Sequence, residues 1–372
     1  MKLLKLIACL ALVSCQSTKP LVDKTAKELP FGGRSQPLTV QTESALTTGM
    51  LDQEKKSIDL KVVALTLAGE NEQPSFSKDG VKVLFVSRER PEHSHSQVYE
   101  LTLNPLRERR VTYHDGDDAS PVYHPDGNRL LYASTTDSLK NDPVFIENLK
   151  QMYSPQTASV ETNKVNAKFD LFLSRLDGRD ISRILPNALR GQTSQPELAL
   201  DSKGRIVAFV AQAPERSDVM VYPLSGGSPR KVSSDRESDS PKFSFDGAKI
   251  VWVKNVPKGS QLTMSSVPFS KSVALSEKIA RHLSPSWHPN GEHIVFSSDR
   301  SGDGNLDLYI YSVKTKCLSR ATQSKADESA PVFSPDGKKL AFTSNLSGRN
   351  QIYLAEMKDE LINGKFCLPE AL

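Results

Sequence analysis

The 372-residue sequence has almost no imbalance of charge. It contains 48 lysines and arginines against 44 aspartates and glutamates, a formal charge of +4 at pH 7. Removing residues 1–14, which include two lysines and no acid, lowers the formal charge to +2. This value is too small to favour binding to nucleic acid, and we expect no nucleic-acid partner.

The sequence also lacks common catalytic motifs. It contains no G-x-S-x-G elbow and no H-E-x-x-H helix, so the motifs of a serine hydrolase and of a zinc protease are both missing. The apolar run from Leu6 to Val13 is too short to cross a bilayer as a helix. The sequence therefore favours a protein that is not an enzyme.

Residues 1–14 have the features of a secretion signal. Lys2 and Lys5 precede the apolar run, which ends in the sequence LVSC at Cys15. This end resembles a lipobox, the cleavage site of bacterial lipoproteins, and the resemblance implies that Cys15 is lipidated. The alternative is an ordinary signal peptide with a chance cysteine. Gln16 resembles the outer-membrane sorting signal, so we expect a lipid anchor in the outer membrane, on its periplasmic side.

Residues 15–57 are rich in Lys, Thr, Ser and Gln and include three prolines. Such a composition buries little apolar surface. We interpret this stretch as a flexible tether between the lipid and a folded domain of residues 58–372.

Six copies of one proline-led motif fill that domain. The clearest copy, PVFSPDGKKLAFTSN, runs from Pro331 to Asn345. The repeat prolines are separated by 47, 75, 45, 44 and 46 residues, and they are Pro74, Pro121, Pro196, Pro241, Pro285 and Pro331. A period of about 45 residues indicates a β-propeller or another repeat array.

Each copy predicts its own local structure. A D-G, N-G or K-G turn, in which glycine supplies a positive φ, precedes an alternating apolar strand. Two more strands follow, as in LDLYIYS at 306–312 and LSRATQ at 318–323. Four short antiparallel strands in each of six units predict an all-β, six-bladed β-propeller.

The two ends of the chain offer two ways to close the ring. Residues 60–66 have the form of a fourth strand, and we expect them to complete the sixth blade. The C-terminal tail could take that place instead. Cys317 and Cys367 lie one period plus four residues apart, where neighbouring outer strands can exceed the ~5.5 Å Cα separation of a disulfide. A bridge becomes feasible if the tail folds back over the fifth blade.

Acidic residues precede several of the repeat prolines. These loops enter the innermost strands, so their carboxylates are expected to ring one mouth of the propeller and to attract a cation or a basic partner. The alternative is that they are solvated turn residues. The candidates for partner binding are Glu72, Asp118, Asp239 and Glu328.

An insert of about 30 residues separates the second and third strands of the second unit, at about 137–168. Within it, Phe145, Leu149 and Tyr153 recur at helical spacing. A short amphipathic helix there could dock a partner, or its apolar stripe could lie against the propeller.

Metal binding has only weak support. In the loop DRSGDGNLD, the residues Asp299, Asp303, Asn305 and Asp307 could bind calcium, but a complete calcium loop is missing and a tight turn is the alternative. His93 and His95 lack a third zinc ligand. We expect no cofactor, with calcium as the one ion to consider.

The repeat resembles the WD40-like (PD40) repeat of TolB-type propellers. The pattern P-x-[FW]-S-P-D-G, a strand and then S-[DN]-x-x-G-x-x-x-[IL]-Y is clearest in 331–353 and 285–309. The resemblance implies an envelope propeller whose mouth binds a protein or a ligand. Two departures are the lack of room for the α/β domain that precedes a TolB propeller, and the expected lipid anchor.

We therefore hypothesise a monomeric, lipid-anchored scaffold that binds an envelope protein, which could be another lipoprotein, through one mouth of the propeller. The alternatives are a metal-dependent, lyase-like enzyme acting on glycans and a propeller that binds a small ligand or cation. A lyase of this kind needs several histidines at the mouth. Here His124 and His288 replace the serine of the repeat motif, which fits that function poorly.

Overall fold

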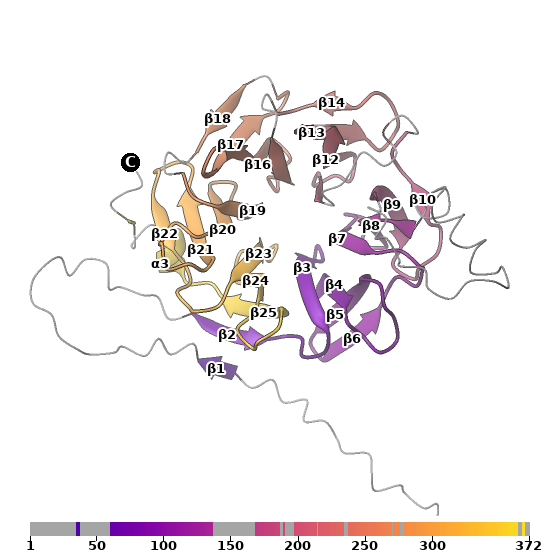
Figure 1. The fold of residues 1–372 in the computed structure, drawn as a ribbon, viewed down its shortest axis with the longest axis horizontal. Helices are drawn as coiled ribbons and strands as arrows, with labels where there is room; N and C mark the ends of the chain where they lie inside the picture. Colours follow the sequence, from indigo (N-terminus) through magenta and orange to yellow (C-terminus); the bar gives the residue numbers. More distant parts are fainter. Residues whose placement is uncertain are drawn as a thin grey trace, which may run out of the picture. The chain divides into compact units, whose positions relative to one another are not determined.

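The computed structural model describes residues 35–37, 60–136, 168–186, 189, 197–213, 215–233, 237–269, 271–275, 279–363 and 367–368. In the compact unit of residues 34–372, these residues form six antiparallel sheets arranged in a ring (Figure 1). The predicted six-bladed propeller is confirmed.

The first five blades each have four strands, which pair in chain order. The strands of blades one and two are β3 (Glu70–Phe76), β4 (Lys82–Arg88), β5 (Gln97–Leu103) and β6 (Leu106–Arg110), then β7 (Asp118–Tyr123), β8 (Arg129–Ser134), β9 (Asp170–Arg175) and β10 (Ser182–Arg183). Those of blades three and four are β11 (Leu198–Leu200), β12 (Ile206–Ala213), β13 (Arg216–Pro223) and β14 (Arg230–Lys231), then β15 (Ser238–Phe243), β16 (Lys249–Val256), β17 (Gly259–Ser266) and β18 (Ser272–Ala274). Those of blade five are β19 (His282–Trp287), β20 (His293–Ser298), β21 (Asp307–Ser312) and β22 (Leu318–Arg320).

The sixth blade joins the two ends of the chain. It contains β23 (Glu328–Phe333), β24 (Lys339–Ser344) and β25 (Gln351–Glu356), and β2 (Lys61–Ala64) pairs antiparallel with β25. The expectation that residues 60–66 complete this blade is therefore confirmed. A further strand, β1 (Ser35–Pro37), pairs with the outer edge of β2.

The C-terminal tail returns to blade five. After β25 the chain forms α3 (Asp359–Ile362), in which Leu361 is buried against the interface of blades five and six. The Leu368 N–H donates to the Leu318 carbonyl at 2.7 Å, and Cys317 and Cys367 form a disulfide with a Cα separation of 5.2 Å. The tail therefore folds back over blade five, as the predicted disulfide requires. The disulfide joins the end of the chain that leaves blade six to the outer strand of blade five.

The repeat motif folds into the same hairpin turn in several blades. In blade six the Ser334 hydroxyl donates to Asp336 Oδ1 at 2.5 Å, and Asp336 accepts the Lys338 N–H at 3.0 Å. Gly337 has a φ of +71°, which glycine adopts without strain. His124 and His288 take the place of this serine, and each ring Nδ1 accepts the N–H two residues later.

The hydrophobic core is divided among the interfaces between blades. For example, Leu84 and Val98 of blade one pack with Leu130, Tyr132 and Phe172 of blade two. Clusters of the same kind join the other neighbouring pairs, including blade six to blade one. Because each blade buries both of its faces against neighbours, the ring is the unit that is stable.

Candidate functional site

The inner strands β3, β7, β11, β15, β19 and β23 all begin at one face of the ring. Each follows a connection from the outer strand of the preceding blade. The second strands end and the third strands begin at this same face. We call this the mouth face.

A bulge in the inner strands decides which side chains are buried there. In blade six the pairing of β23 with β24 shifts between Ser329 and Val332, and Ala330, just before the repeat proline, has a φ of +48°. The residues with the same left-handed backbone before the proline of other blades are Gln73, Ser120, Ser240 and Ser284. The residue three positions before the proline is buried in each of these five blades, at Asn71, Asp118, Ser238, His282 and Glu328.

Two of the predicted mouth acids fall on that buried position. Asp118 is 1% exposed and Glu328 is 2% exposed. The Thr112 hydroxyl donates to Asp118 Oδ2 at 2.5 Å, and the Thr322 hydroxyl donates to Glu328 Oε2 at 3.0 Å. This differs from the expectation of a ring of exposed carboxylates, because the bulge turns these two side chains into the blades.

Burial changes the acidity of both groups. Desolvation raises the pKa of Asp118 well above its ordinary value. Burial, with the nearby charge of Asp307, raises the pKa of Glu328 to about 7. Both side chains therefore have a structural role. Each one accepts a hydrogen bond from a threonine in the connection that leads from the preceding blade into its own inner strand.

The other two predicted acids stand one residue later and are partly exposed. Glu72 accepts hydrogen bonds from Arg88 Nη2 at 2.6 Å and from Asn350 Nδ2 at 2.7 Å. Asp239 accepts one from Asn255 Nδ2 at 2.9 Å, while its Oδ1 has no hydrogen-bond partner among the described residues. Burial raises the pKa of Asp239.

Asp239 belongs to a charged cluster that joins blades three and four. Glu197, just before β11, interacts with Ser240 and with the charge of Asp239, and burial followed by that charge raises its pKa. Glu197 Oε2 has no hydrogen-bond partner among the described residues. Lys242 donates to the Leu198 carbonyl at 3.0 Å, and burial lowers its pKa although Glu197 opposes the shift.

Sequence reasoning missed Glu197 and Lys242. Both stand directly after a repeat proline, where the other copies have Ser75, Val122, Ser286 and Val332. Charged residues of opposite sign at this position in two consecutive copies are the signal that could have found them.

The candidate calcium loop is occupied by an arginine. Arg320 Nη2 lies 2.8 Å from Asp303 Oδ2 and 2.5 Å from Asp307 Oδ2. Asn305 Nδ2 donates to the Ser324 carbonyl at 2.8 Å, and Asp299 Oδ1 accepts the Arg281 N–H. The described residues contain no group of three or more His, Cys, Asp or Glu side chains suited to a metal ion.

The remaining candidates have different outcomes. Cys15, Phe145, Leu149 and Tyr153 lie outside the described residues. His93 Nε2 hydrogen-bonds the Tyr99 hydroxyl at 2.8 Å within blade one. In the part of the chain that the structure describes, no helix is long and apolar enough to span a membrane.

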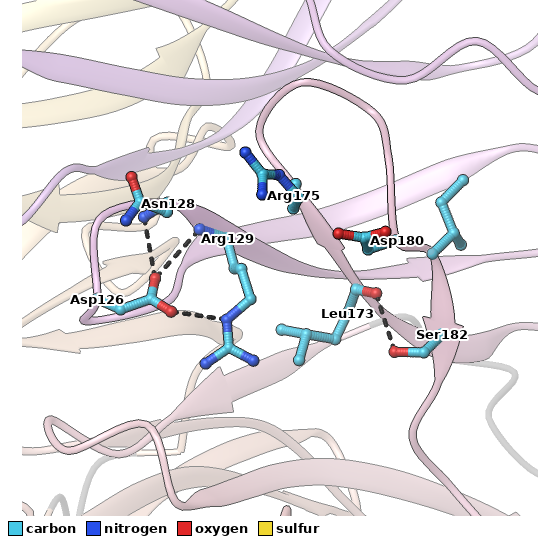
Figure 2. Close-up of a pocket in the computed structure, with 8 residues that line it drawn as sticks. Asp126, Asn128, Arg129, Leu173, Arg175, Asp180 and Ser182 are labelled. Carbon is cyan, nitrogen blue, oxygen red and sulfur yellow. Dashed lines mark hydrogen bonds and ion pairs between the residues drawn. The ribbon is translucent and has the colours of Figure 1, made fainter.

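The face opposite the mouth holds a pocket of about 610 Å³ on blade two (Figure 2). It lies between the β7–β8 turn and the β9–β10 turn. Its walls are formed by Asp126, Asn128, Arg129, Leu173, Arg175, Asp180, Ile181 and Ser182.

Residues 206–364 match the family model PD40, the TolB beta propeller domain. The propeller is TolB-like. Among curated proteins, the chain is 25% identical to the TolB homolog of Chlorobium luteolum over 155 residues, 41% of this chain and 35% of that protein. It is 33% identical to the Tol-Pal system protein TolB of Francisella tularensis subsp. mediasiatica over 96 residues, 25% of this chain and 22% of that protein. The match thus spans about a third or less of these relatives.

Solved structures share the fold of this TolB-like ring. TolB from Agrobacterium tumefaciens superposes with a TM-score of 0.55 at 16% identity, covering 80% of this chain and 93% of that one. An oligogalacturonate lyase in complex with manganese gives 0.53 at 16% identity, covering 89% and 99%. A gluconolactonase from Xanthomonas campestris gives 0.56 at 11% identity, covering 81% and 90%. At these identities the likeness concerns the fold alone.

Proposed function

We propose that this TolB-like chain is a cell-envelope scaffold, anchored through a lipidated Cys15, whose mouth face binds a protein partner through a basic group. The observation that carries the proposal is the cluster of Glu197, Asp239 and Lys242. In it, two carboxylates from neighbouring blades repel each other, and a single lysine lies near them to balance their charge.

Two carboxylates beside one lysine leave an excess of negative charge, and a cation that approaches this part of the mouth face is attracted by it. A lysine or arginine side chain offers both the donors and the compensating charge. The one lysine of the cluster is already engaged with the Leu198 carbonyl. A basic side chain of a partner therefore suits this site, and the names of the curated relatives as Tol-Pal system proteins support an envelope setting.

The proposal has a pH signature. The pKa values of Glu197 and Asp239 are raised, so both carboxyl groups take up protons at a higher pH than exposed acids do. A cationic partner needs them ionised. Binding should therefore weaken as the pH falls through these raised values, and it should also weaken with added salt.

The test is crosslinking and affinity recovery from intact envelopes. The chain is compared with the double variant Glu197→Gln and Asp239→Asn, which removes two charges and keeps the side-chain volumes. The matched control is Glu292→Gln with Glu356→Gln, which removes two carboxylates from the opposite face. A third form lacks residues 141–160 and tests the expected role of the insert.

A stoichiometric protein that is lost with the mouth variant and kept with the control supports the proposal. If both double variants recovered the partner protein equally well, the interface would not include Glu197 and Asp239. Recovery of no protein from any form would exclude the scaffold function as stated, and screens with glycans and metal ions would follow.

A further inference from the structure

The pocket on blade two lies on the face away from the proposed partner site. It is built from the two turns that close the hairpins β7–β8 and β9–β10 (Figure 2). At about 610 Å³ it falls within the ~300–1,000 Å³ range typical of small-ligand sites. Its lining contains charges of both signs and an apolar surface.

One acid and one arginine in the pocket are already committed to each other. Asp126 accepts the N–H groups of Asn128 and Arg129 at 2.9 and 3.1 Å, and Arg129 Nε at 2.6 Å. Burial would raise the pKa of Asp126, but these donors hold it at about 2. The Asp126 carboxylate therefore fixes the β7–β8 turn and the position of the Arg129 side chain.

The charges on the second turn are not committed in this way. Arg175 uses only Nε, at 3.3 Å from Asp177 Oδ2, and its side chain is 53% exposed. Among the described residues, the two terminal nitrogens of Arg175 and the carboxylate of Asp180 have no hydrogen-bond or ion-pair partner. Both residues line the pocket. Among the described residues, the pocket lining therefore offers the two terminal nitrogens of Arg175 and the carboxylate of Asp180 to a ligand.

Apolar surface lies beside these charges. Leu173 is partly buried against the interface of blades two and three, and Ile181 is 49% exposed although it lines the pocket. Figure 2 shows Leu173 below Arg175 and Asp180. The exposed isoleucine, beside an arginine and an aspartate that line the same pocket, is a surface that an apolar side chain of a ligand would cover.

We propose that this pocket binds a short zwitterionic peptide with an apolar side chain. Its carboxylate would be held by the terminal nitrogens of Arg175, whose planar fork matches a carboxylate. Its ammonium group would be held by Asp180, and its apolar side chain would cover Leu173 and Ile181. This site is independent of the partner site on the mouth face.

The test is isothermal titration with the dipeptide alanyl-leucine. Two further probes each lack one charge: the amide of the dipeptide lacks the carboxylate, and its N-acetyl form lacks the ammonium. The protein variants are Arg175→Met and Asp180→Asn. The matched control is Arg179→Met, because Arg179 belongs to the same turn and does not line the pocket.

We expect the unaltered chain to bind alanyl-leucine at least about tenfold more tightly than either probe that lacks a charge, since each probe loses one charged hydrogen bond. Arg175→Met should abolish the preference for the carboxylate, and Asp180→Asn the preference for the ammonium. Arg179→Met should change neither. Thermal unfolding midpoints equal to that of the unaltered chain establish that the variants are folded.

Two results would overturn the proposal. One is the absence of heat at millimolar dipeptide with the unaltered chain. The other is binding that keeps both preferences in both variants, because the dipeptide would then occupy a different site.

Discussion

Arg320 and Asp307 face each other across β22 and β21, with Nη2 2.5 Å from Oδ2, and they lie 13 residues apart in the sequence. In three other blades, a residue at or near the start of the third strand is joined to a basic residue of the fourth strand at this same separation. These pairs are Gln97 with Arg110, Asp170 with Arg183, and Asp218 with Lys231. The recurrent pair joins the third and fourth strands of these four blades near the mouth face.

Replacing Arg320 by methionine should destabilise the fold strongly. The Asp307 side chain is fully buried and would lose its compensating charge, close to the buried Glu328. Breaking a buried pair in this way costs about 3–5 kcal/mol. Urea unfolding measures the loss. Arg349→Met is the control, because Arg349 and its partner Glu89 are both 60% exposed and such a pair contributes about 0–1 kcal/mol.

The Cys317–Cys367 bridge should contribute to stability through the unfolded state. It spans 50 residues, and closing a loop of that length is worth about 4 kcal/mol by chain entropy, with about 2–4 kcal/mol typical. The variant with both Cys317→Ser and Cys367→Ser should lose this amount in denaturant unfolding. Adding reductant should lower the stability of the unaltered chain and leave the variant unchanged. Equal stability of the two forms would contradict this role.

Alanine substitutions at Gly337 and Gly291 should distinguish the cost of backbone strain from the cost of a steric clash between blades. Both have a positive φ, +71° and +69°, but a Cβ on Gly337 would lie 2.5 Å from His288 Nε2, and one on Gly291 would meet nothing within 4 Å. Gly291→Ala should cost about 1–2 kcal/mol from strain alone. Gly337→Ala should cost about 1–3 kcal/mol more, because His288 must move. Adding His288→Ala should remove most of the difference in unfolding free energy.

Glu328 should make the stability of the fold decrease as the pH rises from about 4.5 to about 7. Its folded pKa of about 7 lies above the ordinary value of 4.5, so the folded state binds the proton more tightly than the unfolded state. Its contribution is complete below about pH 4.5 and is lost between there and pH 7, an effect of order 3 kcal/mol. Glu328→Gln should gain stability relative to the unaltered chain across this window. If the thermal unfolding midpoints of Glu328→Gln and of the unaltered chain changed with pH in the same way, the prediction would be wrong.

The sequence determined the architecture because every copy of the repeat encodes its own turn and strands. The motif from Ser334 to Gly337 forms its hairpin from hydrogen bonds within a few residues. The period also fixed the number of blades. Closure of the ring by residues 60–66 followed from counting strands in the last unit, and the pairing of β2 with β25 bears this out.

The tertiary structure decided which charged side chains remain available. Asp118 and Asp239 look equivalent in the sequence, yet they stand three and two residues before their prolines, and neighbouring residues of a strand point to opposite sides. The bulge at Ser120 and Ser240 sets that side, so Asp118 is buried and Asp239 stays partly exposed. Likewise, only the folded chain brings Arg320 to Asp303 and Asp307, and so determines that this loop pairs with a guanidinium group. Sequence records which charges exist, whereas their partners lie across strands and blades and depend on the packed ring.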